Sequence, residues 1–224
     1  MFALTPRDGG DARIRIFTPN SELPFAGHPT LGSAFVLASE REQIAIETGL
    51  GRDGGRIVFG RMSQPLPTIA PFDGGPELLH ALAVERSLLP LEVYVNGPRT
   101  VMVGLEDELA VSALSPNMQA LVPLAANICC FAPTARGLWK VRVFGPALGV
   151  HEDPATGSAA GPLALHLARH GAIAYGQEIE IRQGAEILRP SVLRARVEGS
   201  REQIERIEVG GAAVIVARGE FELS

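Results

Sequence analysis

The clearest change of hydrophobic pattern along the chain lies within residues 141–170. Residues 141–145 alternate apolar and polar side chains, which predicts a strand, and residues 159–170 place apolar side chains at the spacing of a buried helix. Between them lies E-D-P-A-T-G-S, an acidic turn with glycine and serine at residues 152–158. Turns of this composition open helices, and we expect the chemistry of the protein at this junction.

The same pattern of strand, loop and buried helix occurs once more, near the start of the chain. In the register that aligns the two copies, His28 falls opposite Asp153. A repeat of this kind predicts two similar half-domains, and packing them about a pseudo-twofold axis would bring His28 and Asp153 together across one cleft. Chance similarity between two short loops is the alternative. The matching pairs are R-I-F-T-P (15–19) with R-V-F-G-P (142–146), and G-H-P-T-L-G-S-A (27–34) with E-D-P-A-T-G-S-A (152–159).

Periodicity and turn residues elsewhere predict many short strands around two enclosed helices. This pattern favours an α+β fold over a doubly wound sheet. The best linker is residues 65–76, which are rich in Pro and Gly-Gly. The predicted helices are residues 30–38, with Thr30 as N-cap, 77–84, 116–121 and 159–170. The predicted strands are residues 1–4, 12–17, 43–48, 56–60, 92–95, 100–104, 109–113, 127–132, 139–144, 178–182, 191–198, 205–209 and 212–218.

Composition narrows the class of protein without naming a function. The chain has 224 residues, 46% of them hydrophobic, and a net charge of −5. That is enough to bury a substantial core. The acidic balance and the lack of a Lys/Arg run with interleaved aromatics argue against nucleic acid as a partner. The sequence has no long apolar span and no signal-peptide pattern, so we expect no membrane association and a cytoplasmic location.

Two residues are candidate proton carriers. Asp153, at the mouth of a helix, is either a carboxylate stabilised by the helix dipole or a catalytic group. His28 is either a hydrogen-bonded structural residue or an imidazole that exchanges protons beside a carboxylate. The repeat favours the catalytic interpretation of both. The backbone N–H groups of Thr156, Gly157 and Ser158 are candidates to hold an anionic group or a developing oxyanion.

Other chemistry-bearing residues favour structural roles. His166 and His170 have the spacing that places two imidazoles on one helix face, but the segment lacks the Glu of H-E-x-x-H, so zinc is the weaker interpretation. For the adjacent Cys129 and Cys130, the pattern predicts buried structural thiols on opposite faces of a strand. The Gly-rich residues 49–55 could cradle phosphate, but no helix clearly follows them.

Four segments together resemble the PhzF-like family of phenazine-biosynthesis isomerases and their relatives. They occur in the family's order and span nearly the whole chain, and the first two are specific to it. The segments are E-L-P-F-A-G-H-P-T-L-G-S-A (22–34), E-D-P-A-T-G-S-A-A-G-P-L (152–163), R-Q-G-A-E-I-L-R-P-S (182–191) and V-G-G-A-A-V-I-V-A-R-G-E (209–220).

The resemblance implies the diaminopimelate-epimerase-like fold, with two similar lobes, each a curled, mostly antiparallel sheet or barrel around a central helix. We expect the first lobe at residues 1–76 and the second at 77–224, with the last strand crossing back to the first. It also implies proton transfer without a cofactor or metal, on a small cyclic or amino/hydroxy carboxylic acid, in a homodimer. The family's site positions match catalytic His28 and Asp153, and substrate-binding Gly27, Thr156, Gly157 and Ser158.

One departure from the family concerns its principal acid/base, a Glu in an S-E-T-x-F-like segment. Phe2 matches the Phe of that segment, so the Glu would lie before Met1, and we expect the opening strand and helix of the first lobe to be missing. Three interpretations follow. The native protein starts earlier and is an ordinary isomerase, the remaining residues support a weaker proton transfer, or the chain is a catalytically silent protein that binds a small ligand or a partner.

Overall fold

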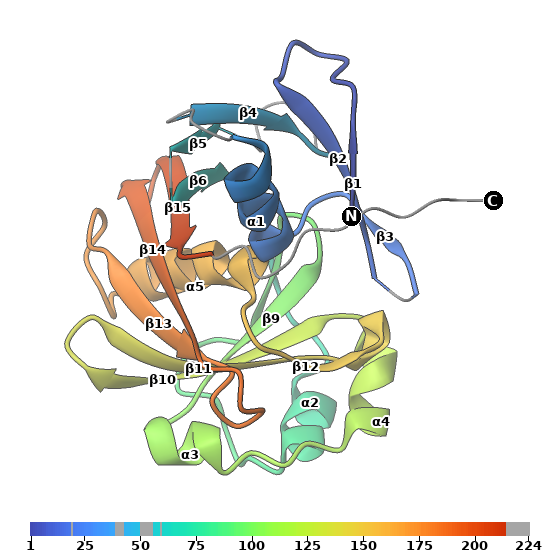
Figure 1. Cartoon of the computed structure of the whole chain (residues 1–224). Helices are drawn as coiled ribbons and strands as arrows, with labels where there is room; N and C mark the ends of the chain where they lie inside the picture. The colour runs from blue at the N-terminus through green and yellow to red at the C-terminus, as the bar shows by residue number, and fades with distance from the viewer. Residues whose placement is uncertain (19, 39–42, 50–55, 59, 214–224) are drawn as a thin grey trace.

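The computed structural model describes residues 1–18, 20–38, 43–49, 56–58 and 60–213, and for residues 28, 43 and 56–58 it describes the backbone alone. In this part of the chain, strands form one continuous, strongly curled sheet around two helices, α1 (Gly27–Leu37) and α5 (Gly157–Arg169) (Figure 1). This arrangement confirms the predicted α+β class.

The sheet has 15 strands among the described residues. Their order is β1-β2-β4-β5-β6-β15-β14-β13-β11-β10-β9-β8-β7, with β3 added to β2 and β12 added to β11. The strands are β1 (Phe2–Leu4), β2 (Ala12–Phe17), β3 (Glu22–Leu23), β4 (Gln43–Glu47), β5 (Arg56–Val58), β6 (Arg61–Gln64), β7 (Thr68–Pro71), β8 (Glu92–Val95), β9 (Arg99–Gly104), β10 (Asn127–Ala135), β11 (Leu138–Gly145), β12 (Val150–Asp153), β13 (Ile179–Gln183), β14 (Ser191–Gly199) and β15 (Ile204–Gly211).

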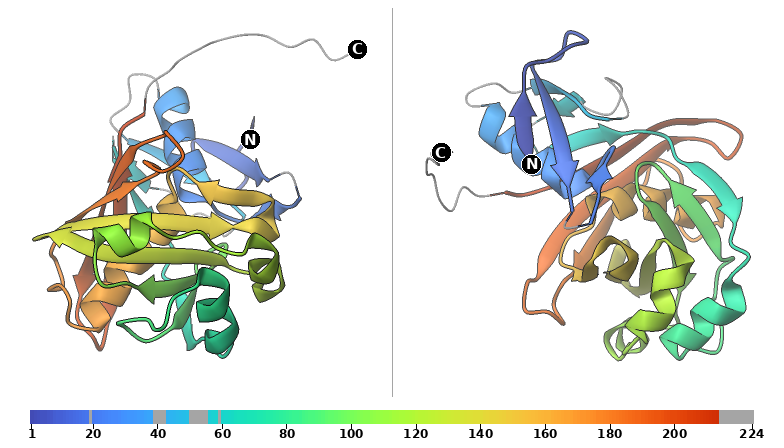
Figure 2. Two further views of the ribbon diagram at one scale, coloured as in Figure 1. Left: turned by 90° about the horizontal axis from the view of Figure 1, so that it is seen from below. Right: turned by 90° about the vertical axis from the view of Figure 1, so that its right-hand side faces the viewer.

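Strand β15 joins the early part of the sheet to the late part. It pairs antiparallel with β14 on one side and with β6 on the other, so that Val209 lies opposite both Ala195 and Met62. The right-hand view of Figure 2 shows the N-terminal strands β1 and β2 projecting at one edge of the molecule. The first third of the chain is therefore held to the rest through a strand that comes last.

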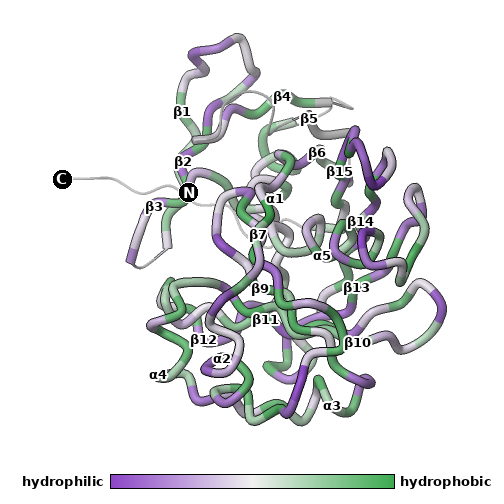
Figure 3. Tube along the Cα trace, turned by 180° about the vertical axis from the view of Figure 1, so that it is seen from behind, coloured by the Kyte–Doolittle hydropathy of each residue, from purple (hydrophilic) through white to green (hydrophobic). Residues whose placement is uncertain are grey.

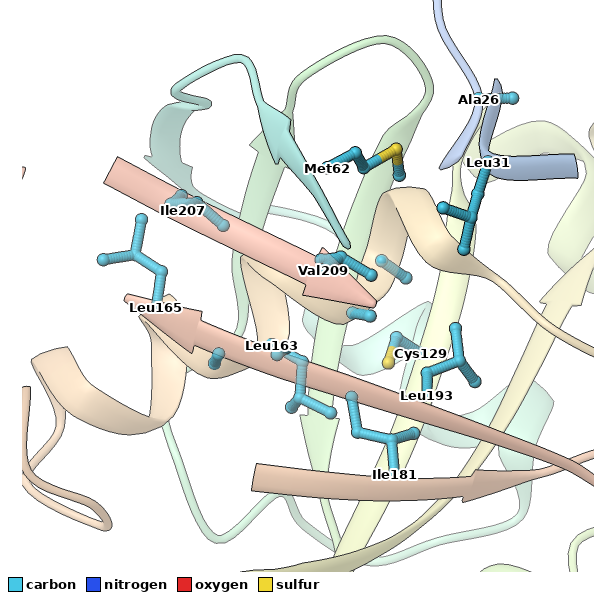
Figure 4. Packing of buried hydrophobic residues seen from close by; sticks show 14 of the residues in the cluster. Ala26, Leu31, Met62, Cys129, Leu163, Leu165, Ile181, Leu193, Ile207 and Val209 are labelled. Carbon is cyan, nitrogen blue, oxygen red and sulfur yellow. The ribbon is translucent and has the colours of Figure 1, made fainter. Parts of the chain in front are cut away.

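Two apolar cores lie on the two faces of the sheet. The larger one surrounds α5 and α1 and includes Leu163, Met62 and Val209 (Figure 4). The smaller one lies under α2 (Gly75–Leu82), α3 (Glu108–Ser112) and α4 (Met118–Leu121). Figure 3 shows that the loop between β1 and β2, by contrast, is polar. No helix of the described residues is both long and apolar enough to cross a membrane.

The predicted start of the first buried helix was wrong. Thr30 is not its N-cap, because α1 already begins at Gly27 after the N-cap Ala26. Pro29 fits the first turn because backbone N–H groups there have no partner within the helix. The Thr30 hydroxyl instead donates back to the Ala26 carbonyl at 2.8 Å.

Residues 109–113 were predicted as a strand and instead lie within and just after helix α3. Asp107 is the N-cap of this helix, and its side chain accepts a hydrogen bond from the N–H of Ala110 at 2.8 Å. A cap of this kind stabilises a first helical turn, and it outweighs the weak strand pattern of five residues. Of the strand predicted at residues 212–218, all but the first two residues lie outside the described part of the chain, as do residues 50–55 of the Gly-rich loop.

Candidate active site

The repeated sequence pattern is a repeated structure, and we call its copies the first and second units. In the first unit, β2 pairs antiparallel with the short returning strand β3, and α1 follows. In the second unit, β11 pairs antiparallel with β12, and α5 follows. Ile16 lies opposite Leu23 in one unit and Val143 lies opposite Asp153 in the other. Asp153 therefore ends the returning strand just before the buried helix.

The two buried helices touch at their N-termini. A Cβ added to Gly27 would lie 2.6 Å from the Cα of Gly157 and 2.6 Å from the backbone N of Ser158, so only glycine permits this approach. Neither helix has a side chain hydrogen-bonded as a cap, and neither has an acidic residue in its first turn. Free N–H groups and the positive ends of two helix dipoles are thus brought together, and Asp153, bound to Thr156 just ahead of α5, is the carboxylate near them. This is a geometry suited to an anion.

A cavity of about 240 Å³ lies beside this contact, with both units in its walls. At roughly 30 Å³ per water molecule, it holds about eight waters, so it suits a small acid. Apolar walls with a few polar groups are typical of such sites. The first unit contributes Ile16, Phe17 and Pro29, and the second contributes Asp153, Thr156 and Ser158. A second cavity of about 320 Å³ has Ser191 as its sole polar side chain among the described residues.

Asp153 is held in a short polar network. The hydroxyl of Thr156 donates to Asp153 Oδ2 at 2.6 Å. Gln183, on β13, donates from Nε2 to the Asp153 carbonyl at 2.6 Å and to Thr156 Oγ1 at 2.8 Å. Its Oε1 accepts the N–H of Thr156 at 3.1 Å. Because Thr156 Oγ1 accepts from Gln183, its own proton is directed at the carboxylate, which fixes the orientation of Asp153.

The sequence analysis missed both glutamines that hold the start of α5. Gln183 is 2% exposed, and its one sequence signal is its place in the R-Q-G segment. Gln64, on β6, donates to the carbonyl of Gly157 at 2.6 Å. A Cβ at Gly161 would collide with Gln64 Oε1, so this glycine makes room for the amide. Strands from both parts of the sheet thus position the first turn of α5.

The residues predicted for the site gather around the cavity. Asp153, Thr156 and Ser158 line it, whereas Gly27 and Gly157, which pack on each other, line the second cavity. The hydroxyl of Thr156 is bound to Asp153 and its N–H to Gln183, and its role in binding substrate stays a prediction. The backbone of His28 lies in the first turn of α1, directly before Pro29 in the cavity wall. The side chain of His28 lies outside the described part of the chain, so its pairing with Asp153 stays a prediction.

A buried ion pair lies directly behind Asp153. Arg142 on β11 binds Glu152 on β12 through two hydrogen bonds of 3.0 and 2.7 Å, and the two side chains are 9% and 8% exposed. Arg142 also donates to the carbonyl of Leu114 at 2.7 Å. The returning strand that carries Asp153 is thereby fixed to its neighbour and to the segment after α3.

The histidines of α5 form a hydrogen-bonded cluster with β8 at the other end of the helix. Glu92 Oε2 lies 3.2 Å from His166 Nδ1 and 3.0 Å from His170 Nε2, and it accepts from Tyr94 at 2.7 Å. The three candidate metal ligands, Glu92 and the two histidines, lie within 4.8 Å of one another, but these hydrogen bonds account for their arrangement without an ion. Burial lowers the pKa of His166 to about 4, so the imidazole is neutral at pH 7.

Cys129 and Cys130 belong to the two opposite cores, as expected for neighbours on a strand. Both are wholly buried, and burial raises the pKa of Cys129 to about 12. The reactive form of cysteine is the thiolate, which is scarce at this pKa. The two residues are therefore structural thiols, outside the cavity beside Asp153.

Comparison with known proteins places these features in a family. The model of the PhzC-PhzF family, described as phenazine biosynthesis-like protein, matches residues 1–219. Trans-2,3-dihydro-3-hydroxyanthranilate isomerase of Pseudomonas aeruginosa is 52% identical over 230 residues, which cover 97% of this chain and 82% of the relative. The protein of the same name from Pseudomonas fluorescens is 50% identical, with 99% of this chain and 83% of the relative covered.

Solved structures show the same fold. A PhzF-family protein of Bacillus anthracis superposes with a TM-score of 0.80 at 25% identity, covering 99% of this chain and 84% of that chain. A probable proline racemase of Agrobacterium radiobacter superposes with a TM-score of 0.61 at 14% identity, covering 96% and 75%, and this likeness concerns the fold alone. The curled sheet around two central helices is therefore shared beyond the family.

Proposed function

Because the chain belongs to the PhzC-PhzF family of phenazine biosynthesis-like proteins, we propose that it is an isomerase that moves a proton between carbons of trans-2,3-dihydro-3-hydroxyanthranilate or a close ring acid. The substrate follows from the names of the Pseudomonas relatives. The observation that carries the proposal is the meeting of two uncapped helix N-termini, at Gly27 and Gly157, next to a small cavity that Asp153 and Ser158 line.

The substrate carboxylate binds at the paired helix N-termini. In α5 the first helical hydrogen bonds come from the N–H groups of Ala159 and Ala160 to the carbonyl of Thr156. The N–H groups of Gly157 and Ser158 precede these bonds and are available to an acid. Removing a proton from a carbon conjugated with the acid pushes negative charge toward its oxygens, and fixed N–H dipoles stabilise that charge.

Asp153 and His28 carry the proton. An isomerisation keeps the molecular formula, so a proton taken from one ring carbon must be matched by a proton delivered to another. A carboxylate oriented by Thr156 and an imidazole are both groups suited to give and take protons. Each comes from one unit, so we expect the two groups to act from different sides of the bound acid.

The alternative of a catalytically silent binding protein has no support among these relatives, because those named for an activity are isomerases. Four further expectations remain predictions. They are the boundary between two lobes near residue 76, the homodimer, the cytoplasmic location, and the lack of a cofactor or metal. A small-molecule acid is the partner that the cavity supports.

Turnover in D₂O tests the proposed function directly. The purified chain is mixed with trans-2,3-dihydro-3-hydroxyanthranilate, and the ring protons of the product are followed by NMR. We expect conversion with deuterium entering at the carbon that gains the new proton, because an acid/base group exchanges with solvent between turnovers. An unchanged substrate would contradict the proposal, and conversion without any deuterium would contradict proton transfer through Asp153 and His28.

A further inference from the structure

Asn127 is a buried polar residue in the wall of the cavity that the sequence analysis did not single out. It begins β10, and its side chain faces the cavity that Asp153 and Ser158 also line. The residue is 6% exposed. Its next neighbour Ile128 pairs with Phe144, so Asn127 lies across from Gly145.

Gly145 creates the space that the amide occupies. A Cβ at Gly145 would lie 2.5 Å from Asn127 Oδ1, closer than any hydrogen-bonding or packing contact. Gly145 lines the same cavity. A larger residue at this position would push the amide away from the cavity, so the two positions together keep one polar group exposed to whatever binds there.

The amide of Asn127 has no hydrogen-bond partner among the described residues, unlike most polar side chains around it. The hydroxyl of Thr18 donates to the carbonyl of Ser21 at 3.1 Å, and the hydroxyl of Thr156 donates to Asp153. An amide carries two donors and an acceptor. The amide atoms are not among the fully enclosed polar atoms that lack a partner, so they reach the open space of the cavity, where a ligand can supply the hydrogen bond.

We propose that Asn127 determines specificity by hydrogen-bonding the amine beside the carboxylate of the substrate ring or the hydroxyl on the next ring carbon. The inference rests on the proposed function, because the helix N-termini hold the carboxylate there and leave the other polar substituents without a partner. An amide can accept from an amine or a hydroxyl and can also donate to a hydroxyl. A ring acid without these substituents would leave the amide unpaired and should bind more weakly.

Binding of four aromatic acids tests this inference without needing turnover. The acids are benzoate, anthranilate, 3-hydroxybenzoate and 3-hydroxyanthranilate, and their Kd values are measured by calorimetry. The wild-type chain should bind 3-hydroxyanthranilate at least about tenfold more tightly than benzoate, the effect of one hydrogen bond of about 1.4 kcal/mol. Of the two singly substituted acids, the one that binds more tightly identifies the group that Asn127 contacts.

Variants of Asn127 decide whether the amide is responsible. Asn127→Leu, similar in shape and without polar atoms, should bind all four acids within about threefold of one another. Asn127→Ser is the second variant, in case the first does not fold, and it should lose most of the preference because its hydroxyl is too short to reach. Thr18→Val is the matched control, since the Thr18 hydroxyl is already engaged by Ser21, and it should keep the wild-type preference.

Two failures are distinguishable. If the wild-type chain converts the dihydro acid but Asn127→Leu keeps the full preference for 3-hydroxyanthranilate, the role of Asn127 is wrong and the proposed function stands. If the wild-type chain discriminates among the acids and Asn127→Leu does not, yet nothing is turned over, the role of Asn127 stands and the proposed reaction is wrong. Equal binding of all four acids by the wild-type chain would overturn the role of Asn127 outright.

Discussion

The two units share a chain path but differ in how firmly they are held. In each, an arginine of the first strand binds a glutamate of the returning strand through two hydrogen bonds. The side chains of Arg15 and Glu22 are 50% and 42% exposed, whereas those of Arg142 and Glu152 are 9% and 8% exposed. Only the second unit has its loop fixed by a glutamine from another strand, among the described residues.

The helices differ in the same way. All residues of α5 from Gly157 to Ala168 are buried, whereas Val36 of α1 is 63% exposed. The repeated sequence pattern gives both units the same order of strand, returning strand and helix. The extent of burial then determines how rigidly each unit holds its side chains at the cavity. The second unit supplies a rigid wall with an oriented carboxylate, and the first supplies a second helix N-terminus and the backbone of His28.

The largest expected effect comes from the two proposed proton carriers, one from each unit. Asp153→Asn and His28→Asn should each lower kcat about a hundredfold to ten-thousandfold, because each removes a group that exchanges protons. His151→Asn is the control, since His151 is exposed on β12 and outside the cavity wall. Steady-state kinetics measure the effect. Full activity of either proton-carrier variant would remove that residue from the site.

The two ion pairs should differ strongly in their effect on stability. Arg142→Met leaves Glu152 charged, buried and unpaired, which should lower the free energy of unfolding by about 3–5 kcal/mol. Arg15→Met breaks the exposed counterpart, whose attraction is screened by water, and should lower the free energy of unfolding far less. Urea unfolding of both variants measures the difference. Similar losses would show that burial does not distinguish the two units.

The cluster at the C-terminal end of α5 should make stability depend on pH. Burial lowers the pKa of His166 from 6.5 to about 4, with the positive charge of His170 as a further cause. Between these values the unfolded chain takes up a proton that the folded chain does not, so stability falls as the pH falls from 6.5 to 4. The loss is up to about 3 kcal/mol at about 1.4 kcal/mol per pKa unit.

Glu92 acts in the same direction at lower pH. Burial raises its pKa, but hydrogen bonds from His170 and Tyr94 outweigh burial and hold the pKa at about 2. Its contribution is present above pH 4.5 and is lost as the pH falls toward 2. His166→Gln should flatten the decline between pH 6.5 and 4 and leave the lower step. An unchanged slope in urea titrations at several pH values would count against His166.

The smallest effect compares two glycines of α1. Gly27→Ala forces a Cβ against the backbone of Gly157 and Ser158 and should cost about 1–3 kcal/mol. Gly32, which aligns with Gly157 in the repeat, has no atom within 4 Å of an added Cβ. Gly32→Ala should therefore stabilise the chain by about 0.5–1 kcal/mol. Thermal unfolding of both checks the sign, and destabilisation by Gly32→Ala would contradict the assigned packing.

Local pattern predicted the parts of the fold that depend on neighbours in sequence. The sequence predicted strands β2 and β11 from their alternation, helix α5 from its apolar spacing, and the turn before α5 from its composition. Each of these signals spans a few consecutive residues. Residues 109–113 were misread, because five residues carry too little periodicity to outweigh the cap at Asp107. Pattern could not place the start of α1 either, because proline is acceptable both in a loop and in a first helical turn.

The polar support of the site could not be predicted in the same way. Gln183 contacts residues 27 and 30 positions away, and Gln64 contacts a residue 93 positions away. Each is a single polar side chain in a strand, and its partner depends on how the sheet curls. Asn127 is likewise defined by the glycine across from it on β11. Such pairs become visible only when the strands are placed side by side.

A crystal structure with 3-hydroxyanthranilate bound tests the central claim, that one acid is held between both units, most directly. The account predicts that the carboxylate lies within hydrogen-bond distance of backbone nitrogens in the first turns of both α1 and α5, with the ring beside Asp153 and Asn127. A carboxylate that contacts one helix alone, or an acid bound in the second cavity beside Ser191, would contradict it.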